Sequence, residues 1–259
     1  MVKLRALKVT FLGTGTSQGI PVIGSNHPVC RSSDPRDKRL RVSVLIEVDE
    51  LNIVIDCGPD FRQQMLSNQV QKLDAILFTH EHSDHTVGLD DIRPYFFKQG
   101  DIPVYAHQRV MASLQKRFDY IFDSENKYPG APSVQEHVIT NTAFTVKGVN
   151  IIPVEVMHNR VQVFGFRIRD FAYITDAKIV EEEEAEKLKG VDVLVVNALR
   201  KEPHHSHFNL EEALDFIQKI KPEKAFLTHI SHLLGFHEEV QAQLPPNVYL
   251  AYDNLQIEI

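Results

Sequence analysis

The feature that most constrains the fold of this chain is the segment THEHSDH at residues 79–85, which follows the apolar run AILF at residues 75–78. The segment contains His80, His82, Asp84 and His85, and imidazole and carboxylate groups are good ligands for divalent metal ions. An apolar run that ends in such a segment is typical of a buried strand whose carboxyl end carries a functional loop. We therefore expect a sheet that fixes this loop and further ligands from elsewhere in the chain.

Runs of β-branched and aromatic residues predict strands along the whole chain. The predicted strands are residues 8–12, 42–48, 52–55, 74–78, 103–105, 144–146, 149–156, 161–169, 172–174, 191–196, 224–227 and 248–251. Helical periodicity is clearest at residues 108–122, 181–189, 209–220 and 236–243, and the stretch 123–137 has the composition of a loop. Asn209 is a predicted N-cap, with Glu212 completing a capping box.

Possible hairpins cluster early in each half of the chain, and helices alternate with strands later. This pattern predicts an α/β fold of two mixed sheets packed between helical layers. No linker-like segment divides the chain, so we expect a single domain over residues 1–259.

The composition restricts the cellular context and the partners. A formal net charge of -7 argues against broad binding to nucleic acid, although residues 36–41 form one local basic run. Only Cys30 and Cys57 are present, which excludes a disulfide framework and suits a reducing compartment. Neither a signal-peptide core nor an apolar run long enough for a membrane span is found. We therefore expect a cytoplasmic protein without a membrane partner.

Three further metal-binding side chains stand at the ends of predicted strands. They are His158, Asp176 and His229. Each of them alone is more often a structural, hydrogen-bonded residue than a ligand. Together with the first segment they form an ordered set, in which every member follows a strand.

This order of residues resembles that of the metallo-β-lactamase fold of binuclear hydrolases, over essentially the whole chain. The resemblance implies an αββα sandwich with a metal site at one edge, between its two halves. It also implies that Asp176 bridges two ions, and that Asp56, in IDCG at residues 55–58, holds the site together. The implied ligands are His80, His82 and His158 for one ion and Asp84, His85 and His229 for the other.

The chemistry of such a pair explains this ligand set. Two divalent ions held roughly 3.5–4 Å apart need neutral imidazoles and few carboxylates if they are to remain Lewis acidic. Histidine ligands also need a hydrogen-bond acceptor for the other ring nitrogen, a role that suits Asp56. Zinc and manganese are both compatible with histidine and aspartate ligands.

Two other segments narrow the resemblance. FLGTGTS at residues 11–17 and LTHISH at residues 227–232 resemble the branch that contains tRNase Z and cyclic phosphodiesterases, most closely the phosphoribosyl cyclic phosphate phosphodiesterases of the carbon-phosphorus lyase pathway. That family has a catalytic histidine in a segment matching HFNL at residues 207–210, which implies that His207 is a general acid. The neighbouring His204 and His205 are not separable from it by sequence. Asp84 and His207 are the predicted catalytic residues.

The same family carries a structural zinc ion near its N-terminus, bound by three cysteines and a histidine. Here the corresponding stretch is SNHPVC at residues 25–30, so Ser25 and His27 stand where two cysteines are expected. His27, Cys30 and His232 remain as ligands. Because structural zinc sites nearly always use four protein ligands, an occupied site and a metal-free loop both stay open.

These features predict a metal-dependent phosphodiesterase that acts on small cyclic phosphates, such as a phosphoribosyl cyclic phosphate or a 2′,3′-cyclic nucleotide. The alternatives are a tRNase Z-like endoribonuclease, a hydrolase of lactones, thioesters or β-lactams, and a metal-binding scaffold without catalysis. tRNase Z enzymes usually carry a basic arm rich in glycine and proline, and the sequence shows no such insertion. We expect a small-molecule substrate and no nucleic-acid partner. The sequence leaves open whether the protein forms a homodimer.

Overall fold

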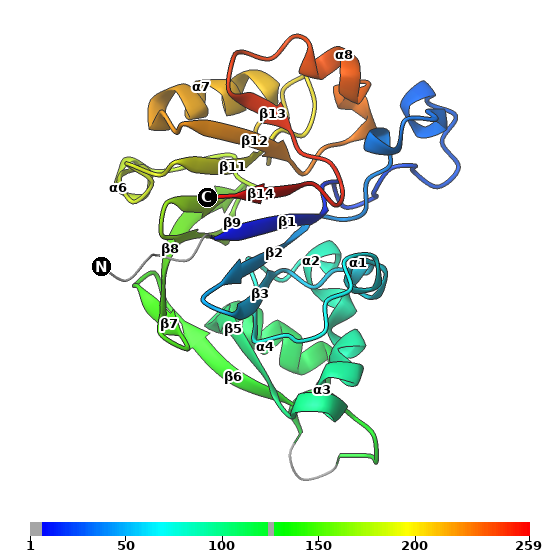
Figure 1. Cartoon of the computed structure of the whole chain (residues 1–259), viewed down its shortest axis with the longest axis vertical. Helices are drawn as coiled ribbons and strands as arrows, with labels where there is room; N and C mark the ends of the chain where they lie inside the picture. Colours follow the sequence, from blue (N-terminus) through cyan, green and yellow to red (C-terminus); the bar gives the residue numbers. More distant parts are fainter. Residues whose placement is uncertain (1–6, 124–126) are drawn as a thin grey trace.

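The computed structural model describes residues 7–123 and 127–259, and within these residues the chain forms two mixed sheets of seven strands each (Figure 1). Neighbouring strands pair in parallel from β3 to β6 in the first sheet, and antiparallel among β14, β1, β2 and β3. In spatial order the first sheet contains β14 (Gln256–Glu258), β1 (Lys8–Gly13), β2 (Ser43–Val48), β3 (Leu51–Ile55), β4 (Ala75–Leu77), β5 (Ile102–His107) and β6 (Val134–Ile139).

The second sheet is built in the same way from the later part of the chain. Its strands pair antiparallel from β7 to β10 and in parallel from β10 to β13. In spatial order they are β13 (Val248–Leu250), β12 (Lys224–Thr228), β11 (Val193–Asn197), β10 (Phe171–Tyr173), β9 (Val161–Ile168), β8 (Val149–His158) and β7 (Phe144–Val146).

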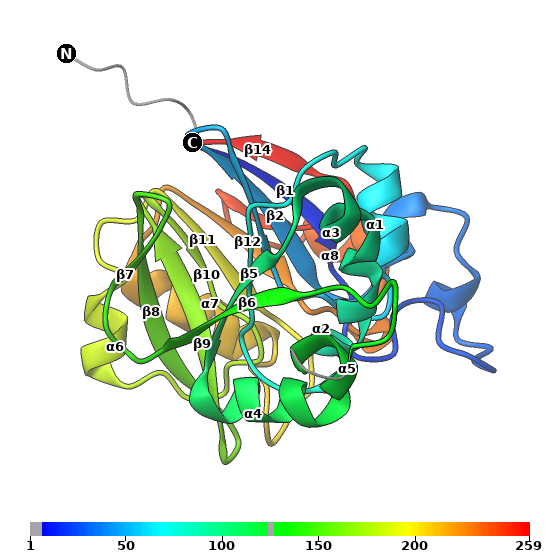
Figure 2. The ribbon, with the colours of Figure 1, turned by 90° about the horizontal axis from the view of Figure 1, so that it is seen from below.

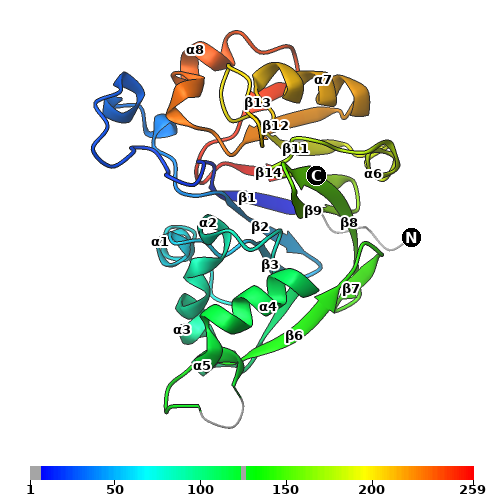
Figure 3. The same cartoon turned by 180° about the vertical axis from the view of Figure 1, so that it is seen from behind.

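Helices cover the outer faces of both sheets. On the first sheet lie α1, α3 and α4, and on the second α7 and α8 (Figures 1 and 3). None of the described helices combines the length and the apolar character that crossing a membrane requires. The α-helices are α1 (Phe61–Ser67), α2 (Ser83–Thr86), α3 (Arg93–Gln99), α4 (Gln108–Arg117), α5 (Asp119–Phe122), α6 (Glu182–Glu186), α7 (Leu210–Ile220) and α8 (His237–Gln241).

Three apolar layers hold these elements together. Alternate residues of a strand face opposite sides of its sheet, so Ile53 and Ile55 of β3 join the layer between the sheets, whereas Val54 faces the helices. The central layer also contains Phe166 of β9 and Val195 of β11. The predicted fold class, an αββα sandwich of two mixed sheets, is therefore confirmed.

Several local predictions need correction. Residues 134–137 lie in β6 and not in a loop, because an edge strand can carry polar side chains on an exposed face and so lacks a clear alternation. Residues 124–126 of that predicted loop lie outside the described residues. The predicted helix over 108–122 is interrupted at Phe118, and β14, α1 and α3 were not predicted because they are short. The predicted capping box of Asn209 and Glu212 is confirmed.

The topology brings the carboxyl ends of strands from both sheets to one edge. The chain leaves β4 into residues 78–82, leaves β10 into residues 174–176, and leaves β12 into His229. β8 runs in the same direction as β10, because both are antiparallel to β9, so His158 at its end reaches the same edge. The segment that contains the short 3-10 helices at Pro28–Arg31 and Pro35–Asp37 projects to one side (Figure 2).

Candidate metal centre

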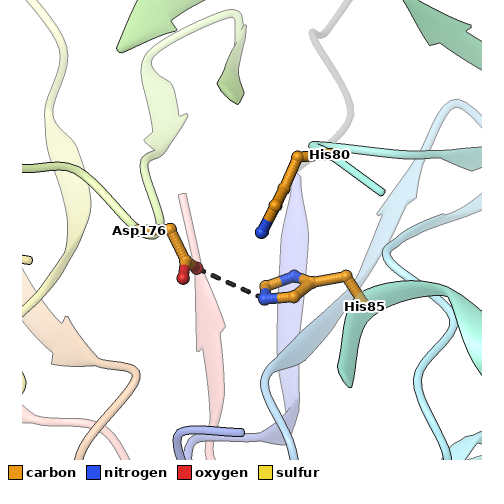
Figure 4. Close-up of side chains that lie close together, drawn as sticks. All are labelled: His80, His85 and Asp176. Atoms are coloured by element: carbon orange, nitrogen blue, oxygen red, sulfur yellow. Dashed lines mark ion pairs between the residues drawn. The ribbon is translucent and has the colours of Figure 1, made fainter. Parts of the chain in front are cut away.

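Imidazole and carboxylate groups from both halves of the chain converge at this edge. The Nε2 atom of His85, in α2, lies 3.3 Å from Oδ2 of Asp176, which follows β10 (Figure 4). His80 points toward the same space, and its Nε2 atom lies 2.9 Å from Nδ1 of His82. The segment 79–85 is not wholly a loop as predicted, because Ser83–Thr86 forms one helical turn that turns His85 inward.

The ligand atoms form three overlapping groups among the described residues, each compact enough to hold a metal ion. One of them, Asp84 with His85 and His229, equals a predicted ligand set. The other two groups differ from the predicted division of the ligands between two ions, because both groups include Asp176 and neither includes His82. They are His80, His85 and Asp176, and His158, Asp176 and His207. His82 nevertheless contacts His80 and lies in ring contact with His158, with ring centroids 5.2 Å apart.

The donor set fits a cation. Nε2 of His85 and both ring nitrogens of His229 are buried and have no hydrogen-bond partner among the described residues. A buried polar atom without a partner costs roughly 1–3 kcal/mol, and a positive ion facing the one lone pair of the neutral His229 ring would remove that cost at that nitrogen. Six of the seven predicted ligands therefore lie in groups whose spacing suits a divalent metal.

Asp56 contacts two residues that position the ligands, Thr79 and His85. Its carboxylate accepts hydrogen bonds from the backbone N–H of Thr79 at 2.9 Å and from the Thr79 hydroxyl at 2.8 Å. The same carboxylate lies 2.6 Å from Nδ1 of His85, which leaves Nε2 of that ring directed at the centre. Thr79 also lies 3.0 Å from Nδ1 of His80. Thr79 was missed by the sequence interpretation, although its place beside His80 was a signal.

Close backbone packing fixes the other aspartate of the segment. A Cβ atom added to Gly58 would lie 2.1 Å from the carbonyl oxygen of Asp84, and one added to Gly88 would lie 2.1 Å from the carbonyl oxygen of Gly58. Neither distance can be accommodated without displacing backbone. Both glycines are therefore required for the position of Asp84, which sequence analysis did not predict.

The histidines and aspartates at the centre strongly shift one another's pKa values. Burial alone would lower the pKa of His85, but the carboxylates of Asp84, Asp56 and Asp176 outweigh it and hold that pKa well above its ordinary value. Burial would raise the pKa of Asp176, yet the neighbouring His229 and His85 keep it well below the ordinary range. In the metal-free protein Asp84 and Asp176 are thus ionised and His85 is protonated at neutral pH, whereas burial raises the pKa of Asp56.

Metal binding is therefore expected to release a proton from His85, because an imidazole ligand must be neutral. As pH falls, the proton competes better, so the apparent metal affinity should weaken by about tenfold per pH unit below the raised pKa of His85. Calorimetric zinc titrations at pH 7 in buffers of different ionisation enthalpy measure this release. Binding without proton release would contradict the protonated state of His85.

Asp56→Asn should weaken metal binding by about 10- to 100-fold, since the amide lacks the negative charge and the second acceptor oxygen with which Asp56 holds both Thr79 and His85. Competition against a chromophoric chelator measures this change. Asp60→Asn is the matched control, because Asp60 pairs with Arg41 in the same part of the chain and lies outside the three ligand groups. An unchanged affinity in Asp56→Asn would show that His85 needs no such support.

His207 is the one histidine of its segment that reaches the centre. It is buried, and its Nε2 atom lies 3.0 Å from Oδ1 of Asp176. Burial lowers the pKa of His207 to about 4, so the side chain is neutral at pH 7 in the metal-free protein. His205 is exposed and His204 is half-buried, which separates the three neighbours that sequence could not separate.

Ser206 is a second residue that sequence analysis missed. Its carbonyl oxygen lies 2.7 Å from Nδ1 of His158, so His158 donates from Nδ1 and directs Nε2 to the centre. The signal was its place within the run HHSH at residues 204–207. Next to His80 and His82 in the chain, Glu81 pairs with Arg109 at 2.9 Å, and its backbone carbonyl oxygen accepts a hydrogen bond from the Arg117 guanidinium.

The three candidate ligands of an N-terminal zinc ion lie near one another but make other contacts. The rings of His27 and His232 are in edge contact, with centroids 4.9 Å apart, but Nδ1 of His27 accepts a hydrogen bond from the backbone N–H of Val29. Cys30 is buried, and its sulfur accepts from the N–H of Val22 at 3.5 Å. These three side chains are not among the groups of converging ligand atoms in the described residues.

The glycines at residues 13 and 15 also have a structural explanation. A Cβ atom on Gly13 would lie 2.1 Å from the carbonyl oxygen of Arg41, and one on Gly15 would lie 2.9 Å from that of Arg39. The chain itself therefore occupies the space beside them. They allow the close packing of residues 39–41.

Comparison with known families points to one superfamily. A family described as "Beta-lactamase superfamily domain" matches residues 51–230. Among solved structures, a new diphosphatase from the PhnP family superposes with a TM-score of 0.91 and 39% sequence identity, covering 98% of both chains. The short form of human tRNase Z superposes with a TM-score of 0.69 at 18% identity, covering 96% of this chain, which shows a shared fold.

Two curated relatives are similar in sequence. An octanoyltransferase of Porphyromonas gingivalis is 41% identical over 253 residues, or 96% of this chain. A ribonuclease Z of Bradyrhizobium diazoefficiens is 35% identical over 83 residues, or 31% of this chain. The chain spans only 51% of the length of the first relative, and the match covers 22% of the second.

Proposed function

The chain belongs to the β-lactamase superfamily and, within it, to the PhnP- and tRNase Z-like branch, and from this premise we propose that it is a metal-dependent phosphodiesterase of small cyclic phosphates. The fold and the converging ligands make it a hydrolase of metallo-β-lactamase type. Its substrate class, its metal ions and the roles of individual residues belong to the proposal.

We assign two divalent ions, zinc or manganese, to the centre. His80, His82 and His158 would hold one, Asp84, His85 and His229 the other, and Asp176, which is shared by two of the three ligand groups, would contact both. When bound, such ions act as Lewis acids and lower the pKa of bound water to near neutrality. The chain's own contribution is to fix the ligands, through Asp56 for His85 and through Ser206 for His158.

The observation that carries the proposal is the position of His207. This imidazole stands 3.0 Å from Asp176, but it is not needed to complete either assigned ligand set. An alkoxide leaving group needs a proton as the ester bond breaks, and a buried imidazole at the edge of the centre can supply it. His207 is neutral in the resting protein, and the negative charge of a bound phosphodiester would raise its affinity for the proton that it transfers.

The charge distribution supports a small substrate over a long nucleic acid. The basic run at residues 36–41 does not form a free cationic patch. Arg36 pairs with Asp34 at 2.7 Å, Arg41 pairs with Asp60 at 3.2 Å, and the Arg39 guanidinium is buried against Thr14. Binding to nucleic-acid backbone depends on several exposed cations, which this run does not supply.

The comparisons favour one second candidate, cleavage of a diphosphate linkage. It rests on the diphosphatase that is similar over 98% of the chain. A phosphate leaving group is stable without a proton, so this reaction would not depend on His207. Because one relative is an octanoyltransferase, an acyl substrate is also worth testing, although this chain corresponds to about half of that protein.

A panel of substrates tests the proposal. Purified protein of known metal content would be assayed on a 2′,3′-cyclic nucleotide, a phosphoribosyl cyclic phosphate, a linear diester, a nucleoside diphosphate derivative, precursor tRNA, a lactone and an octanoyl thioester. We expect the highest kcat/KM on a cyclic phosphate. A clear preference for precursor tRNA, diphosphate or acyl substrates would replace the proposed function by the corresponding alternative.

A further inference from the structure

The backbone that carries Asp176 separates from its neighbouring strand just before the metal centre. The pairing of β10 with β11 extends to Tyr173, which lies opposite Val195. The N–H of Ile174 still donates to the carbonyl oxygen of Val195 at 2.8 Å, and the register of the two strands ends there. Asp176 therefore stands on a segment that the backbone of β11 no longer holds.

A side chain of β11 bonds this segment instead, through the amide of Asn197. Its Oδ1 atom accepts a hydrogen bond from the N–H of Ala177 at 2.7 Å, and its Nδ2 atom donates to the carbonyl oxygen of Ala177 at 3.0 Å. Asn197 and Ala177 are both fully buried, so water does not compete for these bonds. One side chain thus satisfies both backbone groups of the residue that follows Asp176, as a paired strand would.

The backbone of Asp176 needs such support. Its φ of 56° lies in the left-handed region, which is unfavourable for a residue with a side chain. A conformation of this kind persists only where the surrounding structure determines it, and it is common at functional sites. The bonds of Ile174 on one side and of Ala177 on the other fix the path of the chain through Asp176, and with it the direction in which the carboxylate points.

Asn197 is itself firmly placed and reaches a second functional segment. β11 is an interior strand of the second sheet, and the backbone of Asn197 lies in its parallel pairing with β12. The carbonyl oxygen of Ala177 also accepts a hydrogen bond from the N–H of Phe208 at 2.7 Å, and Phe208 follows His207 in the chain. The amide of Asn197 therefore connects a fixed strand to the segments that carry Asp176 and His207.

We propose that Asn197 is a positioning residue for Asp176. By holding both backbone groups of Ala177, it fixes the strained backbone of Asp176 and directs the carboxylate into the two ligand groups that share it. This inference rests on the proposed function, in which Asp176 contacts both metal ions. It adds a residue that lies outside the three ligand groups and acts on the metal only through Asp176.

The test uses the whole chain and three variants. Asn197→Leu removes both hydrogen bonds at a similar side-chain size, and Asn197→Thr offers a hydroxyl that is one bond shorter than the amide and replaces at most one of them. Gln99→Leu is the matched control, because Oε1 of Gln99 accepts from the N–H of Leu73 at 3.2 Å and Nε2 donates to its carbonyl oxygen at 2.5 Å. Leu73 precedes β4, whereas the metal centre lies beyond the carboxyl end of that strand.

The readouts are the affinity for cobalt(II) and the visible spectrum of the cobalt-loaded protein, at a temperature where circular dichroism shows each variant to be folded. Asn197→Leu should bind cobalt about 10- to 100-fold more weakly, the usual effect of removing a residue that orients a ligand. Asn197→Thr should lose about 2- to 10-fold, as expected for one neutral hydrogen bond. At saturating cobalt, the spectrum should change in Asn197→Leu, and Gln99→Leu should match wild type in both readouts.

The outcomes separate this inference from the proposed function. A wild-type cobalt affinity and spectrum in Asn197→Leu would overturn the positioning role, and so would an equal loss of affinity in Gln99→Leu. If Asn197→Leu does not fold, Asn197→Thr decides, and a wild-type affinity in that variant would contradict the inference. If the wild-type protein hydrolyses none of the phosphodiesters, the proposed function fails, and the cobalt titrations still decide whether Asn197 positions Asp176.

Discussion

His207→Ala is expected to lose about 10²- to 10⁴-fold in turnover on a phosphodiester with an alkyl leaving group, while keeping its metal ions and its stability. The physical reason is that an alkoxide leaves poorly unless it receives a proton as the bond breaks. His207 is the buried imidazole at the centre that neither assigned ligand set requires. Turnover is measured on a cyclic phosphate after metal analysis of the purified variant.

The leaving group provides the control for this prediction. A p-nitrophenolate departs without protonation, so His207→Ala should be much less impaired on bis(p-nitrophenyl) phosphate. Equal losses on both substrates would assign His207 to substrate binding or to holding the segment. A variant that had lost metal would instead make His207 a ligand, as its grouping with His158 and Asp176 also permits.

Asp84→Ala is expected to lower both the metal content and the rate. Asp84 lies in one ligand group with His85 and His229, and removal of a ligand weakens binding directly. Loss of one ion would remove several kcal/mol of charge stabilisation in the transition state, which corresponds to roughly a 10³-fold lower kcat. Elemental analysis and kcat on the same preparation measure the two effects together.

Asp91→Asn is the matched control for that change, because Asp91 is an acidic residue of the same region that lies outside the three ligand groups. It should retain the full metal content and rate. An Asp84→Ala protein with the wild-type metal content and full activity would show that the assignment of the segment 79–85 to metal binding is wrong.

The sequence predicted the central layers of the fold and the convergence of the site residues. This succeeded because buried strands such as β4 and β12 are short apolar runs that end in polar ligands, and because parallel strands bring such ends to one edge. The periodicity of α7 and its capping box were equally visible, since Asn209 and Glu212 satisfy backbone groups locally.

Other features depend on contacts that sequence spacing does not contain. The requirement for Gly58 arises from the carbonyl of Asp84, which is distant in sequence but adjacent in space. β6 was missed because its exposed edge tolerates polar side chains. The grouping of His80 with His85 and Asp176 depends on ring orientations that only the folded structure defines.

The central claim is that a pair of metal ions in this fold serves phosphodiester hydrolysis. It is tested most directly by adding zinc or manganese stepwise to metal-free protein and measuring the hydrolysis of a 2′,3′-cyclic nucleotide. The protein would carry His27→Ala and Cys30→Ala, so that the N-terminal residues bind no metal. We predict that the rate reaches its plateau at two equivalents of metal. A plateau at one equivalent would contradict the paired site, and the absence of hydrolysis at any metal content would contradict the proposed activity.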